Sequence, residues 1–156
     1  MPQSILFVCY GNIMRSAFAE ACFRREVSQL PELKSTKFAS AGVRAQPDER
    51  AESHARAMAK QLGYSLEGHR ATRTSSALLS PYGRIFSMDQ LNEDLILRDS
   101  PEVRSKTAYL SSLIPGAKKE IEDPYCQSAK QLEACFRTIE LAVRNLAVDC
   151  LHELGD

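Results

Sequence analysis

The strongest constraint on the fold of this chain is an alternation between short apolar β-forming segments and longer segments with helical periodicity. Residues 4–8 form a continuous apolar run, which favours a strand buried on both faces of a parallel sheet. From Ser16 to Pro31 apolar residues recur every three to four positions, which predicts an amphipathic helix. The same patterns predict strands at residues 37–41, 82–88 and 107–113, and helices at residues 47–62, 90–97 and 132–150.

Two of these helices carry end signals or a clear apolar face. In the 47–62 helix, Pro47 suits the first turn and Gly63 is placed to cap the end. The C-terminal helix, which Gly155 is placed to end, has one apolar stripe made of Leu132, Phe136, Ile139, Val143, Leu146 and Cys150.

Strands that alternate with helices predict an α/β fold, a three-layer sandwich with a four-stranded parallel sheet flanked by helices. The 156 residues are 44% hydrophobic and contain no linker or repeat, so we expect a single domain over residues 1–156. Ligands of such sheets bind at the carboxyl ends of the strands. The loop after the first strand is therefore the first place to look for a site.

Charge and hydropathy limit the partners of the chain. The 20 Lys and Arg residues balance the 20 Asp and Glu residues, which removes bulk attraction to nucleic acid or a membrane and leaves only local anion recognition. The longest apolar run, at residues 5–10, is far shorter than the roughly 18 residues of a membrane span. We expect neither nucleic acid nor a membrane as partner, and no secretory signal is evident.

The chain has five cysteines, an odd number without a C-x-x-C pair. This pattern fits neither a disulfide framework nor a structural zinc site, so we expect a reducing, cytoplasmic location. Cys22, Cys135 and Cys150 are expected to pack on helices.

The segment after the first predicted strand combines a nucleophile with an anion-binding pattern. It reads Cys9-Tyr10-Gly11-Asn12-Ile13-Met14-Arg15-Ser16. A cysteine ionises more readily at a helix N-terminus and near an arginine, and the N–H groups of a strand-to-helix turn bind tetrahedral oxyanions. Gly11 and Asn12 tolerate positive φ, and the Arg15 guanidinium can hold two phosphoryl oxygens. These residues therefore predict a phosphate-binding loop with Cys9 as nucleophile.

This loop resembles that of the low-molecular-weight protein tyrosine phosphatases. The resemblance covers most of the chain, because further segments stand in the family's order: Ser40-Ala41-Gly42, Gly68-His69-Arg70-Ala71, Ile85-x-x-Met88-Asp89 and Asp123-Pro124-Tyr125. It implies hydrolysis of protein phosphotyrosine or small aryl phosphates through a phosphocysteine, with inorganic phosphate or a similar oxyanion in the loop. It implies no metal or organic cofactor, and we expect a monomer or a weak dimer.

The resemblance also implies roles for residues outside the loop. Asp123, held extended by Pro124, matches the family's general acid and base. Tyr10 and Tyr125 are expected to form the walls of the substrate cleft, and Arg44, Gln46 and Asp48 fall in the loop that borders it. The polar network that supports the phosphate-binding loop is expected to comprise Asn12, Ser16, Ser40, His69 and Asp89.

The chain departs from the family pattern at Met14, where many members have a second cysteine that protects the nucleophile. Cys126, near the predicted rim, is the one substitute thiol, although a weakly polar rim residue is the plainer interpretation. Two alternatives to the phosphatase stay open. An arsenate reductase on this scaffold needs two more thiols near the third strand, but residues 71–101 contain none. A non-catalytic phosphotyrosine-binding module would not need both Cys9 and Asp123.

Overall fold

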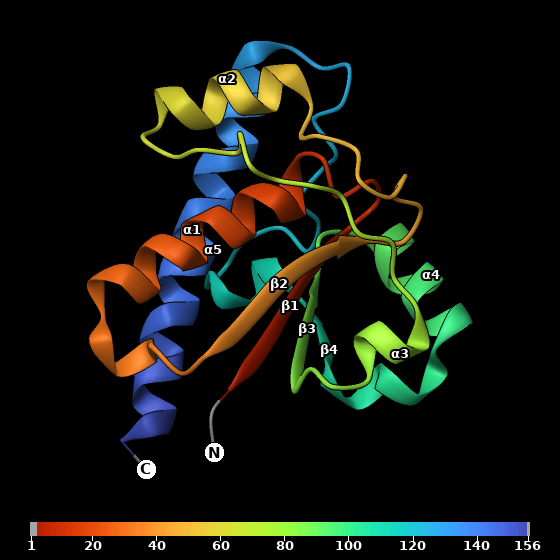
Figure 1. The fold of residues 1–156 in the computed structure, drawn as a ribbon, viewed down its shortest axis with the longest axis vertical. Coiled ribbons are helices and arrows are strands. Elements are labelled where there is room, and N and C mark those ends of the chain that lie inside the picture. The colour runs from red at the N-terminus through yellow and green to blue at the C-terminus, as the bar shows by residue number, and fades with distance from the viewer. Residues whose placement is uncertain (1–2, 156) are drawn as a thin grey trace.

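A computed structural model describes residues 3–155 as a parallel sheet between two layers of helices (Figure 1). Met1, Pro2 and Asp156, which the single-domain prediction includes, lie outside the described residues. The strands are β1 (Ser4–Cys9), β2 (Lys37–Gly42), β3 (Arg84–Ser87) and β4 (Thr107–Tyr109). Their order is β2-β1-β3-β4 and every pairing is parallel. The predicted four-stranded parallel sheet is confirmed.

Alternate side chains of β1 enter two separate cores, as expected for a central strand. Ile5 and Phe7 pack with α1 (Arg15–Gln29) and α5 (Ala129–Leu154) on one face of the sheet. Leu6 and Val8 face the other layer, which contains α3 (Ser76–Leu79), α4 (Gln90–Asp99) and the 3₁₀ helix η2 (Pro101–Lys106). The three-layer sandwich is therefore confirmed.

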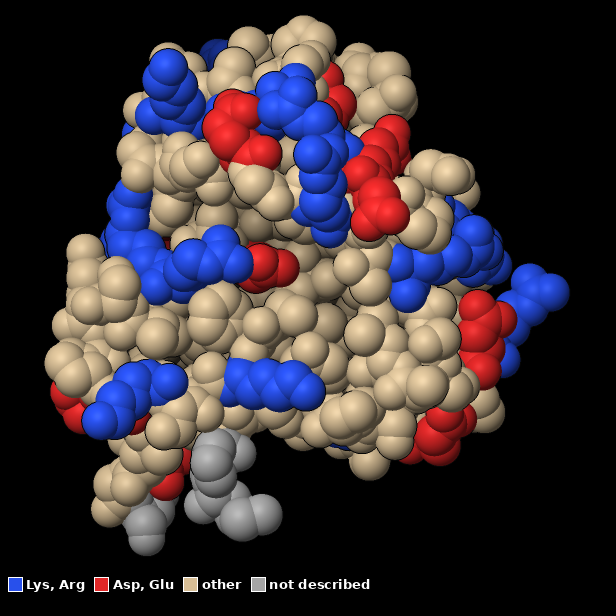
Figure 2. Space-filling model, in the orientation of Figure 1, with Lys and Arg blue, Asp and Glu red and all other residues tan. Residues whose placement is uncertain are grey.

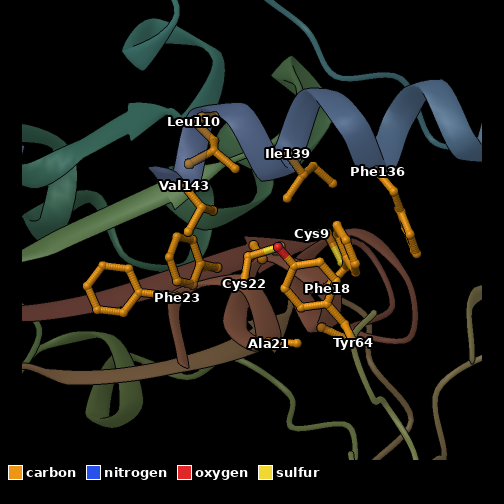
Figure 3. Close-up of a cluster of buried hydrophobic side chains, with 14 of the residues drawn as sticks. Cys9, Phe18, Ala21, Cys22, Phe23, Tyr64, Leu110, Phe136, Ile139 and Val143 are labelled. Atoms are coloured by element: carbon orange, nitrogen blue, oxygen red, sulfur yellow. The ribbon is translucent and has the colours of Figure 1, made fainter. Parts of the chain in front are cut away.

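Helix α5 forms as the sequence predicts. Ser128 and Gln131 form a capping box at its start, and Gly155 is its C-cap. The stacked rings of Phe18 and Phe136, with centroids 4.0 Å apart, join α1 to α5 beneath the loop of Cys9 (Figure 3). The predicted stripe is buried at every position, namely Leu132, Phe136, Ile139, Val143, Leu146 and Cys150.

The predicted start of the second helix is wrong. Helix α2 spans Ser53–Gln61, and its N-cap is Glu52, whose carboxylate accepts the N–H of Ala55 at 3.0 Å. Pro47 lies in a turn instead, because Asp48 has a φ of 69° and its N–H bonds to Ala71 O. Pairing with a distant segment thus replaces the first turns of the predicted helix. Gly63 ends α2 with a φ of 90°, as expected.

Other boundaries also differ from the sequence prediction. Strand β4 ends at Tyr109, and the chain continues as the 3₁₀ helix η3 (Leu110–Leu113). Strand β3 is shorter than residues 82–88, since Tyr82 packs its ring in the core before the strand begins. The sequence patterns do not predict helix α3. Its N-cap is Ser75, whose side chain accepts the N–H of Leu78. The remaining short element is the 3₁₀ helix η1 (Pro31–Leu33).

Surface charge is mixed. Basic and acidic side chains lie beside one another at several places on the face that Figure 2 shows, in line with the net charge of +0. Among the described residues, no helix is long and apolar enough to cross a membrane.

Candidate active site

Cys9 lies at the carboxyl end of β1, and donor groups surround its sulfur. Residues 10–14 turn the chain into α1, which begins at Arg15. The backbone N–H groups of Asn12 and Ser16 point at Cys9 Sγ, with N–S distances of 3.3 and 3.4 Å, and Ser16 Oγ lies 2.8 Å from Sγ. Such donors interact favourably with negative charge on the sulfur.

Asn12 fixes the shape of the turn. It is fully buried and takes the left-handed conformation, with a φ of 56°. Its Nδ2 donates to Ser16 Oγ at 2.8 Å and to Ser40 Oγ at 2.9 Å, while Oδ1 accepts the N–H of Thr72 at 2.9 Å. His69 Nε2 lies 2.6 Å from the carbonyl oxygen of Asn12. The structure thus brings four of the predicted network residues together around one backbone position.

Glu20 extends this network and was missed by the sequence reasoning. Ser40 Oγ donates to Glu20 Oε1 at 2.7 Å. A carboxylate only accepts, so Ser40 uses its proton there and accepts from Asn12 through a lone pair. Asn12 donates in turn to Ser16 Oγ, and the Ser16 hydroxyl lies 2.8 Å from Cys9 Sγ and 3.3 Å from the carbonyl oxygen of Ala41, to which it can also donate. The one available signal was the position of Glu20, one helical turn beyond Ser16.

Gly42, at the end of β2, allows the loop to lie directly against the sheet. A Cβ on this residue would stand 2.7 Å from both Tyr10 O and Asn12 N, which is closer than real Cβ atoms approach backbone. Only a glycine therefore fits beside the turn in its present position.

The Gly42→Ala variant is expected to lower kcat/KM for an aryl phosphate by about 100-fold, because the added methyl group must displace the loop that positions phosphate. Steady-state kinetics on p-nitrophenyl phosphate measures this loss. Gly68→Ala is the matched control, since nothing lies within 4 Å of a Cβ there. Equal kcat/KM for the two variants would mean that the close contact between Gly42 and the loop does not position the phosphate.

Arg15 is buried, and a carboxylate and a backbone carbonyl accept hydrogen bonds from its guanidinium. Its side chain is 2% exposed, and Nη1 donates to Asp89 Oδ2 and to the carbonyl oxygen of Ile121, both at 2.8 Å. Burial works to lower the pKa of Arg15, but the negative charges of Cys9, Asp89 and Asp123 outweigh burial and raise that pKa. Asp89 is also the N-cap of α4, because its Oδ1 accepts the N–H of Asn92. The end of β3 and the start of α4 therefore fix Asp89, and through it the orientation of Arg15.

Asp123 comes from the long segment between η3 and α5. Its Oδ2 lies 3.5 Å from Arg15 Nη2, and its side chain is 47% exposed. Oδ1 accepts the N–H of Tyr125 at 3.1 Å, so the carboxylate is held at the edge of the cleft and remains open to solvent. Arg15 and Asp123, which are distant in the sequence, therefore lie close together at the cleft.

The cleft above Cys9 has a volume of about 370 Å³, with Cys9, Arg15 and Asp123 in its lining. Tyr10 and Tyr125 stand at its mouth, 43% and 56% exposed. The rest of the lining comes from loop residues Gly11, Ile13 and Met14, and from Arg44, Gln46 and Glu49. Asp48, which was expected beside Arg44 and Gln46, is not among the lining residues.

A family model described as low molecular weight phosphotyrosine protein phosphatase matches residues 4–155. This chain belongs to that family. The phosphatase is 33% identical to the low molecular weight protein-tyrosine-phosphatase Etp of Escherichia coli over 145 residues, 93% of each chain. It is 31% identical to a protein-arginine-phosphatase of Geobacillus stearothermophilus over 147 residues, 94% of this chain and 95% of the relative.

A solved structure supports the same assignment. The tyrosine phosphatase Wzb from Escherichia coli, in complex with sulphate, superposes with a TM-score of 0.86 and 35% identity, covering 96% of this chain and 99% of that one. In the described part of the phosphatase, no group of three or more His, Cys, Asp or Glu residues could hold a metal ion.

Three further cysteines of this phosphatase lie on helices α1 and α5. Burial raises the pKa of the Cys135 thiol to about 12 and that of Cys150 to about 11, and it raises the pKa of Cys22 further. These residues therefore stay protonated at neutral pH, as helix packing residues. Cys126 is exposed beside Tyr125. Its role as a substitute thiol that protects Cys9 stays a prediction.

Proposed function

We propose that this protein hydrolyses phosphotyrosine in proteins, and small aryl phosphate monoesters, through a phosphocysteine formed on Cys9. One observation carries the proposal. The sulfur of Cys9, the guanidinium of Arg15 and the carboxylate of Asp123 line a single cleft that has two exposed tyrosine rings at its mouth.

In the first step, the Cys9 thiolate attacks phosphorus, so that the S–P bond forms and the P–O bond to the aryl group breaks. Protonated Asp123 gives its proton to the leaving oxygen. Arg15 and the N–H groups of residues 10–16 hold the other phosphoryl oxygens and stabilise their charge. The family membership and the closeness of Asp123 to Arg15 support these roles.

In the second step, Asp123 accepts a proton from water, which attacks phosphorus and breaks the S–P bond. Inorganic phosphate leaves, the Cys9 thiolate is restored, and Asp123 is again protonated. Because the loop binds the product in the same way as the substrate, phosphate and similar oxyanions should act as competitive inhibitors.

The rims of the cleft favour an aryl ester. Tyr10 and Tyr125 offer aromatic faces against which the ring of a substrate can stack. A phosphoarginine substrate, suggested by the name of one relative, would carry a guanidino group between the same rings. Arsenate reduction remains unsupported, because residues 71–101 contain no cysteine that could supply electrons to arsenate.

The wild-type protein is expected to hydrolyse p-nitrophenyl phosphate and a phosphotyrosyl peptide, with inhibition by vanadate. We expect kcat/KM at least about tenfold higher on phosphotyrosine than on phosphoarginine, the scale of a single well-placed contact. Phosphate release measures both. No turnover would favour the binding module, a preference for phosphoarginine would reassign the substrate, and thiol-dependent arsenite formation would favour the reductase.

We further propose a cytoplasmic location and a monomer or weak dimer. All five cysteines are free thiols in the structure, which is typical of a reducing compartment.

A further inference from the structure

A second hollow lies on the other side of Tyr125 from the catalytic cleft. It has a volume of about 460 Å³ and runs between α2 and residues 124–129 at the start of α5. We call it the α2 groove. Its apolar lining comes from Met14, Ala57, Met58, Ala129 and Leu132.

The α2 groove suits an uncharged, apolar ligand. Met14, Met58 and Leu132 are buried and form its base. Its rim carboxylate, Glu52, is already engaged by the N–H of Ala55 and by His54 Nδ1, at 3.0 and 2.7 Å. Methionine side chains adapt to different shapes, so such a base accepts a class of apolar side chains rather than one.

The α2 groove is continuous with the catalytic cleft, because Met14 and Tyr125 line both. In an extended peptide, neighbouring residues are about 3.3 Å apart and their side chains alternate in direction. In a peptide whose phosphotyrosine enters the cleft, the side chain two residues away points toward the same surface and, past Tyr125, comes within reach of the groove.

We propose that the α2 groove binds an apolar side chain of the protein substrate, two residues from the phosphotyrosine. This inference rests on the proposed function. It also gives a role to two residues that the proposed reaction does not use. Met14, which replaces the second cysteine of many family members, forms part of the base, and Cys126 lies in the wall.

The test uses short phosphotyrosyl peptides with Leu, Met, Gly or Asp at each position from two residues before to two residues after the phosphotyrosine. Ala57→Glu and Ala129→Glu place a charge in the groove from opposite walls, at exposed helical positions that tolerate glutamate. Lys130→Glu is the matched control, because it is also exposed on α5 and changes the net charge more, yet lies outside the groove.

We expect the wild type to prefer Leu or Met over Asp by about tenfold in kcat/KM at one flanking position, the effect of partly burying one such side chain. Both groove variants should lose this preference while Lys130→Glu keeps it, and all should hydrolyse p-nitrophenyl phosphate at the wild-type rate.

Three results would overturn the proposal: a flat peptide profile in the wild type, a preference that survives in both groove variants, or a wild-type dimer that Ala57→Glu dissociates in light scattering. The last would assign the groove to a second copy of the chain. Failure of the proposed function itself is distinguishable, since p-nitrophenyl phosphate would then not be hydrolysed by any form.

Discussion

The Cys9→Ser variant is expected to lose turnover of p-nitrophenyl phosphate by about 10⁴-fold or more, the scale seen when a covalent enzyme loses its nucleophile. A serine hydroxyl is protonated at neutral pH, whereas the proposed reaction needs a charged nucleophile on phosphorus. The guanidinium of Arg15 keeps its bonds to Asp89 and Ile121, and the other N–H groups of the loop are unchanged, so the variant should still bind phosphate. Steady-state kinetics and isothermal titration calorimetry with phosphate measure the two quantities.

Cys150→Ala is the matched control for this loss. Cys150 is a buried residue of α5 and does not line the cleft, so the variant should keep the wild-type rate. We expect only a small loss of stability. Turnover by Cys9→Ser at the wild-type rate would remove Cys9 from the mechanism. Loss of phosphate binding together with turnover would instead indicate that the loop has collapsed.

The features predictable from the sequence are those that depend on neighbouring residues. The apolar run at residues 4–8 was enough to place β1 at the centre of the sheet, and the stripe of α5 was correct at each position. The loop from Cys9 to Ser16 was equally accessible, because strand, turn residues and helix start are contiguous. A local pattern specifies its own geometry.

Features that depend on distant contacts could not be predicted. The turn at Pro47 is set by bonds between residues 48–49 and Ala71, so its helical signal was misleading. The carbonyl of Ile121 that holds Arg15 has no side-chain signature at all. Glu20 has the pattern of an ordinary helix residue, and its role depends on the hydroxyl of Ser40, which lies on β2. Tertiary packing decides each of these contacts.

The Asp123→Asn variant is expected to retain phosphate affinity within about threefold while kcat for phenyl phosphate falls by about 10²–10³-fold, the usual contribution of a positioned acid. Asparagine keeps the size of the side chain and can still accept the N–H of Tyr125, but it has no proton to give to a leaving oxygen. The loss of kcat should be smaller for p-nitrophenyl phosphate, because its less basic leaving group depends less on a proton donor.

A series of aryl phosphates with different leaving groups measures this effect, because kcat of Asp123→Asn should depend more steeply on leaving-group basicity than kcat of the wild type. Glu122→Gln is the matched control, a neighbouring exposed carboxylate outside the catalytic cleft. Equal slopes for Asp123→Asn and the wild type would mean that another group supplies the proton. Since Glu49 is the other carboxylate in the cleft lining, it would then be the next candidate.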